Sequence, residues 1–332
     1  IQWNGSAEIW FTSAYLGRQP VFKISLADGA VTKVTEGDYD MGPLQLRNNT
    51  LVAGIQSMAR PTEVAKVDMA GGQFSMITEV NGHIYESIKM GKSEERYIKT
   101  KDGKDLQMWI IYPPDFDPSK KYPALLYCKG GPQGPLGQSW SYRWNYQVMA
   151  ANGYIVVAIN RRGNSGFGSY WREQISGDYG GKNIQDYLDG IDAMAKEPFV
   201  DKDRLGAVGA SYGGYSVFYL AGMHNKRFKA FVAHCGVYNT VAEYGSTEEY
   251  WYPNKDYQGA PWDKPQPPGY NKFSPHTMVD KWDTPILIIT GANDFRIPYS
   301  QSLEAFNSAQ LRGVPARLLF FENESHWVTK PQ

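Results

Sequence analysis

The sequence predicts an α/β sandwich with a mostly parallel sheet, preceded by part of a β-propeller. Apolar and polar residues alternate in the first part of the chain, whereas continuous apolar stretches separate helix-length segments in the rest. Strands that are apolar throughout are buried on both faces, as in a sheet covered by helices. We therefore expect a partial propeller of about two blades in residues 1–97 and the sandwich in residues 98–332.

Residues 9–82 contain short alternating stretches joined by turn sequences such as ADG and AGG, which are typical of hairpins. Two units, PVFKISLADGAVTKVTEG and TEVAKVDMAGGQFSMITEV, match in order and residue type. Their period of roughly 42 residues is that of a four-stranded blade, and a propeller closes with about four or more blades. The sequence is therefore expected to begin within a domain, and a small β-sandwich is the alternative.

After a link around EERYIKTKDGKDLQMWIIYPP the pattern changes to buried strands and helices. Helices are expected over residues 183–196, 214–223 and 300–311. In a parallel α/β sheet, functional side chains gather at the carboxyl ends of the strands. The expected strands are ALLYC, YIVVAIN, RLGAVGA, AFVAHC, PILIITG and ARLLFFE.

Composition narrows the classes of partner. Acidic and basic residues balance at 34 each, so the charge gives no support for a nucleic-acid or membrane-surface partner. No apolar run approaches the roughly 20 residues that cross a bilayer. Cys128 and Cys235 fall in or beside apolar runs, where free buried thiols are expected rather than a disulfide.

Ser211 stands in Gly209-Ala-Ser-Tyr-Gly213, between the strand RLGAVG and a helix. A serine between glycines at a strand-to-helix turn is typical of a nucleophile elbow. The glycines relieve crowding at the turn, and the backbone N–H of Tyr212 would lie near an oxyanion formed on a substrate. A helix-capping serine is the alternative.

A serine nucleophile requires a base that is oriented by a carboxylate, and α/β-hydrolases carry these residues in the chain order Ser, Asp or Glu, His. Asp294 follows the strand TPILIITG, and His326 follows the strand ARLLFFE. Of five histidines, only His326 lies downstream of Asp294. The alternatives are a loop aspartate that satisfies turn amides and a surface histidine.

At this point the sequence resembles the prolyl oligopeptidase family of serine peptidases, nearest its dipeptidyl-peptidase V and acylaminoacyl-peptidase branch. The resemblance covers residues 98–332 and implies an α/β-hydrolase catalytic domain that accompanies a propeller. It rests on KGGPQG, NRRGNSGFG, GDYGGKNIQD, DKDRLGAVGASYGGY, GANDFRIP and ESHW, which occur in the family's order.

The resemblance implies that Ser211 is the nucleophile, that His326 is the general base and then acid, and that Asp294 orients the imidazole. The backbone N–H groups of Tyr212 and Gly131 would bind the oxyanion. Many relatives place histidine or tyrosine where this chain has Lys129, so a tyrosine hydroxyl donor is excluded there; a solvated lysine is expected, and a catalytic contribution stays open.

Arg296 matches a family arginine that binds the carbonyl of the second residue before the cut; a surface ion pair is the alternative. The aromatic-rich region CGVYNTVAEYGSTEEYWYP corresponds to the family's pocket for the side chain before the scissile bond. Val237, Tyr238 and Trp251 are the candidates for that pocket, although aromatic residues covering the core would give the same pattern.

The predicted function is a serine peptidase that cleaves short peptides through an acyl-enzyme, without a metal or organic cofactor, while the propeller excludes folded proteins. Release of N-terminal dipeptides is preferred. Acylaminoacyl-peptidase or oligopeptidase activity, an esterase, and a catalytically silent interaction protein are the alternatives.

Relatives continue into a final helix, so we expect the sequence to be truncated near its C-terminus and less active than a full-length chain. Exported bacterial relatives imply a periplasmic location, and a homo-oligomer stays open.

Overall fold

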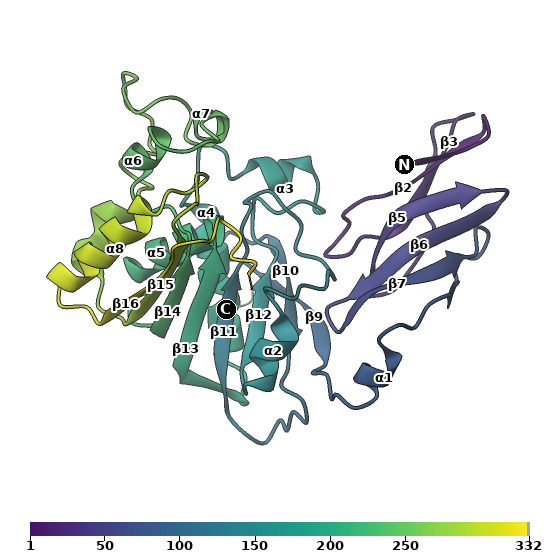
Figure 1. Cartoon of the computed structure of the whole chain (residues 1–332), viewed down its shortest axis with the longest axis horizontal. Coiled ribbons are helices and arrows are strands. Elements are labelled where there is room, and N and C mark those ends of the chain that lie inside the picture. Colours follow the sequence, from purple (N-terminus) through teal and green to yellow (C-terminus); the bar gives the residue numbers. More distant parts are fainter. Residues whose placement is uncertain (331–332) are drawn as a thin grey trace.

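The computed structural model describes residues 1–330, which form three β-sheets and the helices around them (Figure 1). Two small sheets lie at the amino-terminal end of the chain, and one eight-stranded sheet follows. Figure 1 shows the small sheets to one side of the large sheet, next to its edge strand β9 (Ser93–Lys99).

Each small sheet has four antiparallel strands in chain order. The two matching sequence units form equivalent hairpins, β3–β4 and β7–β8, each at the end of its sheet. Trp10, Met41 and Leu51 belong to a core that the two sheets share. The strands are β1 (Gln2–Asn4), β2 (Glu8–Thr12), β3 (Val21–Ser25), β4 (Val31–Lys33), β5 (Asp40–Arg47), β6 (Thr50–Ser57), β7 (Arg60–Val67) and β8 (Phe74–Met76).

The large sheet has the order β16-β15-β14-β13-β11-β12-β10-β9. Strand β10 is antiparallel to both of its neighbours, and the other neighbouring pairs are parallel, which gives the mostly parallel sheet that the sequence predicts. Its other strands are β10 (Asp105–Ile111), β11 (Tyr122–Cys128), β12 (Ile155–Ile159), β13 (Val200–Ala210), β14 (Phe228–His234), β15 (Ile286–Gly291) and β16 (Ala316–Phe321).

The segment expected to be a link is not one. It forms the hairpin β9–β10 of the large sheet, so the expected boundary between residues 97 and 98 falls inside β9. Charged side chains on the edge strand β9 obscure the apolar pattern by which a strand is recognised in the sequence. In β10, by contrast, Leu106–Ile111 is buried throughout.

Helices cover both faces of the large sheet. Because side chains alternate along β11, Cys128 packs into a core with α4 and α5, while Tyr127 packs on the opposite face with Trp144 and Met149, beside α2. The predicted helices correspond to α4 (Lys182–Met194), α5 (Tyr212–Ala221) and α8 (Ser300–Leu311). The remaining helices are α1 (Gly82–Tyr85), α2 (Tyr146–Ala151), α3 (Ser169–Glu173), α6 (Thr240–Tyr244), α7 (Trp251–Asp256) and the 3₁₀ helix η1 (Pro275–Lys281).

Polar contacts join the small sheets to the large one. Arg18 makes two hydrogen bonds to Glu95 at 2.8 and 2.9 Å and stacks 4.8 Å from the ring centroid of Trp109. The indole of Trp109 donates to the carbonyl of Gly17 at 3.2 Å. Within residues 1–330, no helix is both long and apolar enough to span a bilayer.

Candidate active site

Ser211 lies at the carboxyl end of β13, directly before α5. Its backbone has φ 61° and ψ −126°, a conformation that side-chain-bearing residues rarely adopt. The surrounding structure holds this strain, because the N–H of Ser211 donates to the carbonyl of His234 at 3.0 Å and its carbonyl accepts from Tyr215 at 2.9 Å. Ser211 therefore sits on the sharp strand-to-helix turn that the sequence predicts, at the wall of a cavity.

The glycines around Ser211 are required by close backbone contacts. A Cβ at Gly213 would lie 2.1 Å from the carbonyl oxygen of Cys128. A Cβ at Gly209 would lie 2.6 Å from the carbonyl oxygen of Gly213 and 2.7 Å from that of Cys128. Any larger residue would therefore push α5 away from β11, which confirms that these glycines relieve crowding at the turn.

Asp294 and His326 form a buried pair at the ends of β15 and β16. Nδ1 of His326 lies 2.7 Å from Oδ2 of Asp294, and the two residues are 5% and 2% exposed. Oδ1 of Asp294 accepts from the backbone N–H groups of Arg296 and Ile297 at 3.0 and 2.8 Å. Since a carboxylate only accepts hydrogen bonds, the neutral imidazole in this position carries its proton on Nδ1 and its lone pair on Nε2.

Ser211 and His326 line the same cavity, which has a volume of about 690 Å³. Nε2 of His326 lies 4.0 Å from Sγ of Cys235, and in the part of the chain that the structure describes no hydrogen bond joins it to Oγ of Ser211. Such hydrogen bonds are commonly long without substrate. The structure therefore places Ser211 and His326 on one cavity without a hydrogen bond between them, and Asp294 pairs with the imidazole from outside the cavity lining.

Cys235, Asp294 and His326 also offer ligand atoms that lie within 4.8 Å of one another. Both oxygens of Asp294 already accept hydrogen bonds, so the group fits an oriented imidazole better than a metal centre. The thiol of Cys235 is buried and free, as is that of Cys128, which confirms the prediction of unpaired cysteines.

The loop after β11 runs beside Ser211. A Cβ on Gly130 would lie 2.8 Å from the carbonyl oxygen of Ala210 and 3.4 Å from Cβ of Ser211. Gly131, with φ 126°, lines the cavity together with Tyr212, whose N–H begins α5 and is free of an intrahelical partner. The residues of the two predicted oxyanion donors therefore line the same cavity as the serine.

Arg161 holds this loop in place and was missed from the sequence. Its buried guanidinium donates to the carbonyl of Pro132 at 3.2 Å through both terminal nitrogens and to that of Lys129 at 3.3 Å. It also lies 4.6 Å from the ring centroid of Tyr212. One signal for it exists in the sequence, namely two arginines at the carboxyl end of an apolar strand in NRRG.

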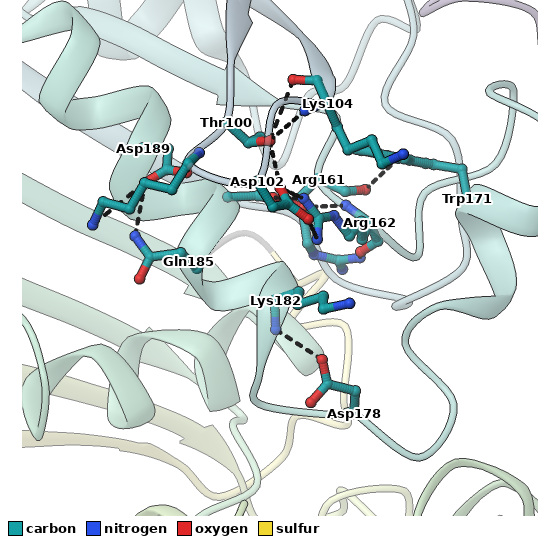
Figure 2. A network of polar contacts seen from close by, with 12 residues as sticks. Thr100, Asp102, Lys104, Arg161, Arg162, Trp171, Asp178, Lys182, Gln185 and Asp189 are labelled. Atoms are coloured by element: carbon teal, nitrogen blue, oxygen red, sulfur yellow. Dashed lines mark hydrogen bonds and ion pairs between the residues drawn. The ribbon is translucent and has the colours of Figure 1, made fainter.

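The neighbouring Arg162 anchors the backbone next to Arg161, and Figure 2 shows it beside Asp102. It makes hydrogen bonds at 2.6 and 2.8 Å to the carboxylate of Asp102 and lies 3.1 Å from Oδ1 of Asp186. The indole of Trp171 donates to the carbonyl of Arg161 at 3.1 Å. Arg161 is therefore held by its backbone as well as by its side chain.

Lys129 lies in the cavity wall and is half-buried. Burial, with the charge of nearby Arg161, lowers the pKa of its ammonium group. Lys129 is therefore partly withdrawn from water, in contrast to the solvated lysine that the sequence predicts.

The predicted substrate residues separate into two groups. Val237, Trp251 and Arg296 line the cavity, and Trp251 is 63% exposed. Tyr238 does not line it: its ring packs 5.8 Å from that of Phe218 in the core below α5. The prediction for Tyr238 is therefore wrong, because consecutive side chains after β14 point in different directions.

Arg296 combines the two roles considered for it. It lines the cavity, and it also forms ion pairs with Glu249 at 3.1 Å and Glu248 at 3.5 Å. Its guanidinium carbon lies 5.8 Å from the ring centroid of Trp327. The acidic partners hold the arginine at the mouth of the site.

Two further aromatic residues line the cavity, Tyr179 and Tyr252, and sequence reasoning missed both. We call these two residues the aromatic wall. The hydroxyl of Tyr252 donates to the carboxyl of Glu243, which is fully buried. Burial raises the pKa of Glu243 to about 8, so this acid is mostly protonated at neutral pH.

Comparisons with known proteins agree with this geometry. The model of the prolyl oligopeptidase family matches residues 140–332. Dipeptidyl-peptidase 5 of Porphyromonas gingivalis is 46% identical over 335 residues, a match that covers all of this chain and 49% of the relative. Dipeptidyl-peptidase 5 of Schizosaccharomyces pombe is 33% identical over 338 residues, with coverage of 100% and 48%.

Among solved structures, an acylaminoacyl peptidase of Pyrococcus horikoshii superimposes with a TM-score of 0.86 at 25% identity, covering 96% of this chain and 50% of the other. The chain spans about half the length of the curated relatives it matches. The eight-stranded sheet has the α/β-hydrolase fold, and the chain belongs to the prolyl oligopeptidase family of peptidases.

Proposed function

We propose that this chain carries the catalytic site of a serine peptidase that removes dipeptides from the amino terminus of short peptides. The observation that carries the proposal is the position of Ser211 on a strained turn, in one cavity with His326, whose imidazole is paired with the buried Asp294. The 46% identity to a dipeptidyl-peptidase 5 supports the choice of dipeptide release.

In this mechanism Nε2 of His326 takes the proton of Ser211 as Oγ attacks the scissile carbonyl. The N–H groups of Tyr212 and Gly131 stabilise the oxyanion of the tetrahedral intermediate. His326 then protonates the leaving amine, and a water molecule activated by the same imidazole hydrolyses the acyl-enzyme. Asp294 keeps the proton on Nδ1 and stabilises the imidazolium.

Several other residues are assigned supporting roles in substrate binding and positioning. Arg161 fixes the loop after β11 through hydrogen bonds to the carbonyls of Lys129 and Pro132. Arg296 binds the carbonyl of the second residue before the cut, and Val237 with the aromatic wall receives the side chain of the residue directly before the cut. No step requires a metal or an organic cofactor.

We propose further that the two four-stranded sheets are blades of a β-propeller that limits access to the cavity. Their strand order, their matching hairpins and their shared core support this assignment. A closed ring of blades would admit oligopeptides and exclude folded proteins.

Removal of single acylated amino acids is a second candidate, favoured by the TM-score of 0.86 with an acylaminoacyl peptidase. The two activities are separated by hydrolysis of a dipeptidyl 4-nitroanilide with a free amine and of an N-acetylaminoacyl 4-nitroanilide, with 4-nitrophenyl butyrate as the ester control. We expect the full-length protein to prefer the free-amine substrate by roughly tenfold or more in kcat/KM. Preference for the acetylated substrate would support the second candidate, and turnover of the ester alone would contradict both. The variant Ser211→Ala should turn over none of them.

A further inference from the structure

Arg143 is an arginine of the cavity wall whose donors are unused. It lines the same cavity as Ser211, and its guanidinium makes no hydrogen bond or ion pair with any residue in the range 1–330. The guanidinium carbon lies 5.7 Å from the ring centroid of Trp144 and 5.1 Å from that of Trp327. Two indole rings therefore hold a cation whose Nε is buried without an acceptor.

The other arginines that line the cavity differ from Arg143 in having acidic partners, although Nε of Arg296 is also buried without a hydrogen-bond partner in residues 1–330. Arg172 pairs with Glu173 at 2.9 Å, and Arg296 pairs with two glutamates. Burial lowers the pKa of Arg143, which agrees with the lack of a carboxylate beside it. A guanidinium offers five donors and no acceptor, and withdrawing it from water without a partner is costly, so its position suits an anion that arrives with the substrate.

Arg143 lies on the side of the site opposite the aromatic wall. Tyr179, Tyr212 and Val237 belong to the core on the α5 face of the sheet. Trp144, next to Arg143, packs 5.8 Å from the ring of Tyr127, on the α2 face. If the acyl side chain occupies the aromatic wall, the leaving peptide extends toward the α2 face.

The position of His326 also places the leaving group near Arg143. It must protonate the leaving amine, and Trp327, the next residue, has its ring 5.4 Å from the imidazole ring. The same indole stacks on Arg143. The guanidinium therefore lies one aromatic ring away from the group that delivers the proton.

We infer that Arg143 binds the α-carboxylate of the leaving peptide, so that the site favours tripeptides and tetrapeptides with a free carboxyl terminus. The inference rests on the proposed function and deepens it. A residue of extended chain spans roughly 3.5 Å, so only a leaving group of one or two residues brings its carboxylate close to a group beside the imidazole. A carboxylate and a guanidinium match in geometry and form paired, charge-assisted hydrogen bonds.

The test compares a tripeptide that has a free carboxylate with the same tripeptide amidated at its carboxyl terminus, using the full-length protein. The ratio of the two kcat/KM values is measured for the wild type, Arg143→Gln, Arg143→Lys and the control Arg172→Gln. Taking a ratio within each variant cancels a general loss of activity. A dipeptidyl 4-nitroanilide is included for each protein, because it tests dipeptide release without any carboxylate in the leaving group.

We expect the wild type and Arg172→Gln to prefer the free acid by roughly tenfold or more, the effect of a hydrogen bond between charged groups. The ratio should fall to near one in Arg143→Gln and stay between these limits in Arg143→Lys, which keeps the charge and an aliphatic stem between the indoles. Equal rates for acid and amide in the wild type, or an unchanged preference in Arg143→Gln, would overturn the inference while leaving dipeptide release intact. A wild type that cleaves neither the tripeptides nor the nitroanilide would overturn the proposed function and this inference with it.

Discussion

Replacing Asp294 with asparagine removes the charge of the buried pair and leaves its shape. Oδ1 accepts two backbone N–H groups, at 3.0 and 2.8 Å, whereas Oδ2 faces Nδ1 of His326 at 2.7 Å. Because two donors require an oxygen at the first position, the asparagine must turn its NH₂ group toward His326. The imidazole then accepts a hydrogen bond at Nδ1 and carries its proton on Nε2.

An imidazole protonated at Nε2 cannot take the proton of Ser211, and the charge that would stabilise the imidazolium is gone. We therefore expect kcat/KM to fall roughly a thousand- to ten-thousandfold, which is about 4 to 5.5 kcal/mol of transition-state stabilisation. Each hydrogen bond keeps a donor and an acceptor, so the free energy of unfolding should change by only about 1 kcal/mol.

The assay is hydrolysis of a dipeptidyl 4-nitroanilide by the full-length Asp294→Asn protein, combined with thermal unfolding. The reasoning about the tautomer requires a large loss of rate in a protein that still unfolds cooperatively near the wild-type temperature. A folded variant that keeps more than about a tenth of the wild-type kcat/KM would refute it.

Three further predictions concern the framework of the site. Gly213→Ala places a Cβ 2.1 Å from a carbonyl oxygen and should abolish activity and lower the unfolding temperature, whereas Gly245→Ala, with no atom nearer than 3.9 Å, should melt like the wild type. The pKa of Glu243 is raised from 4.5 to about 8, so the stability that its neutral form provides is lost as pH rises through this window, at up to about 1.4 kcal/mol per pH unit. Glu243→Gln stays neutral and should lose less stability in thermal melts between pH 6 and 9; an equal loss would contradict the assignment. Arg161→Met leaves the carbonyls of Lys129 and Pro132 without their donor. It should lower kcat more than it raises KM, and it should lower the free energy of unfolding by about 3 kcal/mol. Steady-state kinetics that show a normal kcat would contradict the positioning role of Arg161.

The sequence predicts most of the large sheet because its strands are buried on both faces and have one dominant pattern. The helix expected over residues 300–311 has those bounds in the structure. The hairpin β9–β10 was missed because an edge strand carries charged residues, and β5 (Asp40–Arg47) because a glycine and a proline interrupt its alternation. Local patterns therefore fail where burial is one-sided or the strand is irregular.

The site was predictable where chemistry imposes a local motif. The turn around Ser211 requires glycines at fixed spacing, and the order of the strands places Asp294 and His326 beside it. The contacts of Arg143 and Arg161 were not predictable, although the arginine pair in NRRG marks the position of Arg161, because each guanidinium acquires its surroundings through segments distant in the chain. Such contacts leave no spacing rule in the sequence.

Labelling of the full-length protein with a fluorophosphonate, followed by mass spectrometry of the modified peptide, tests the central assignment most directly. If the imidazole of His326 activates Ser211, one adduct forms on Ser211, forms much more slowly in Asp294→Asn, and is absent from Ser211→Ala. An adduct on another residue, or equal labelling of the Ser211→Ala protein, would contradict the assignment of Ser211 as the nucleophile.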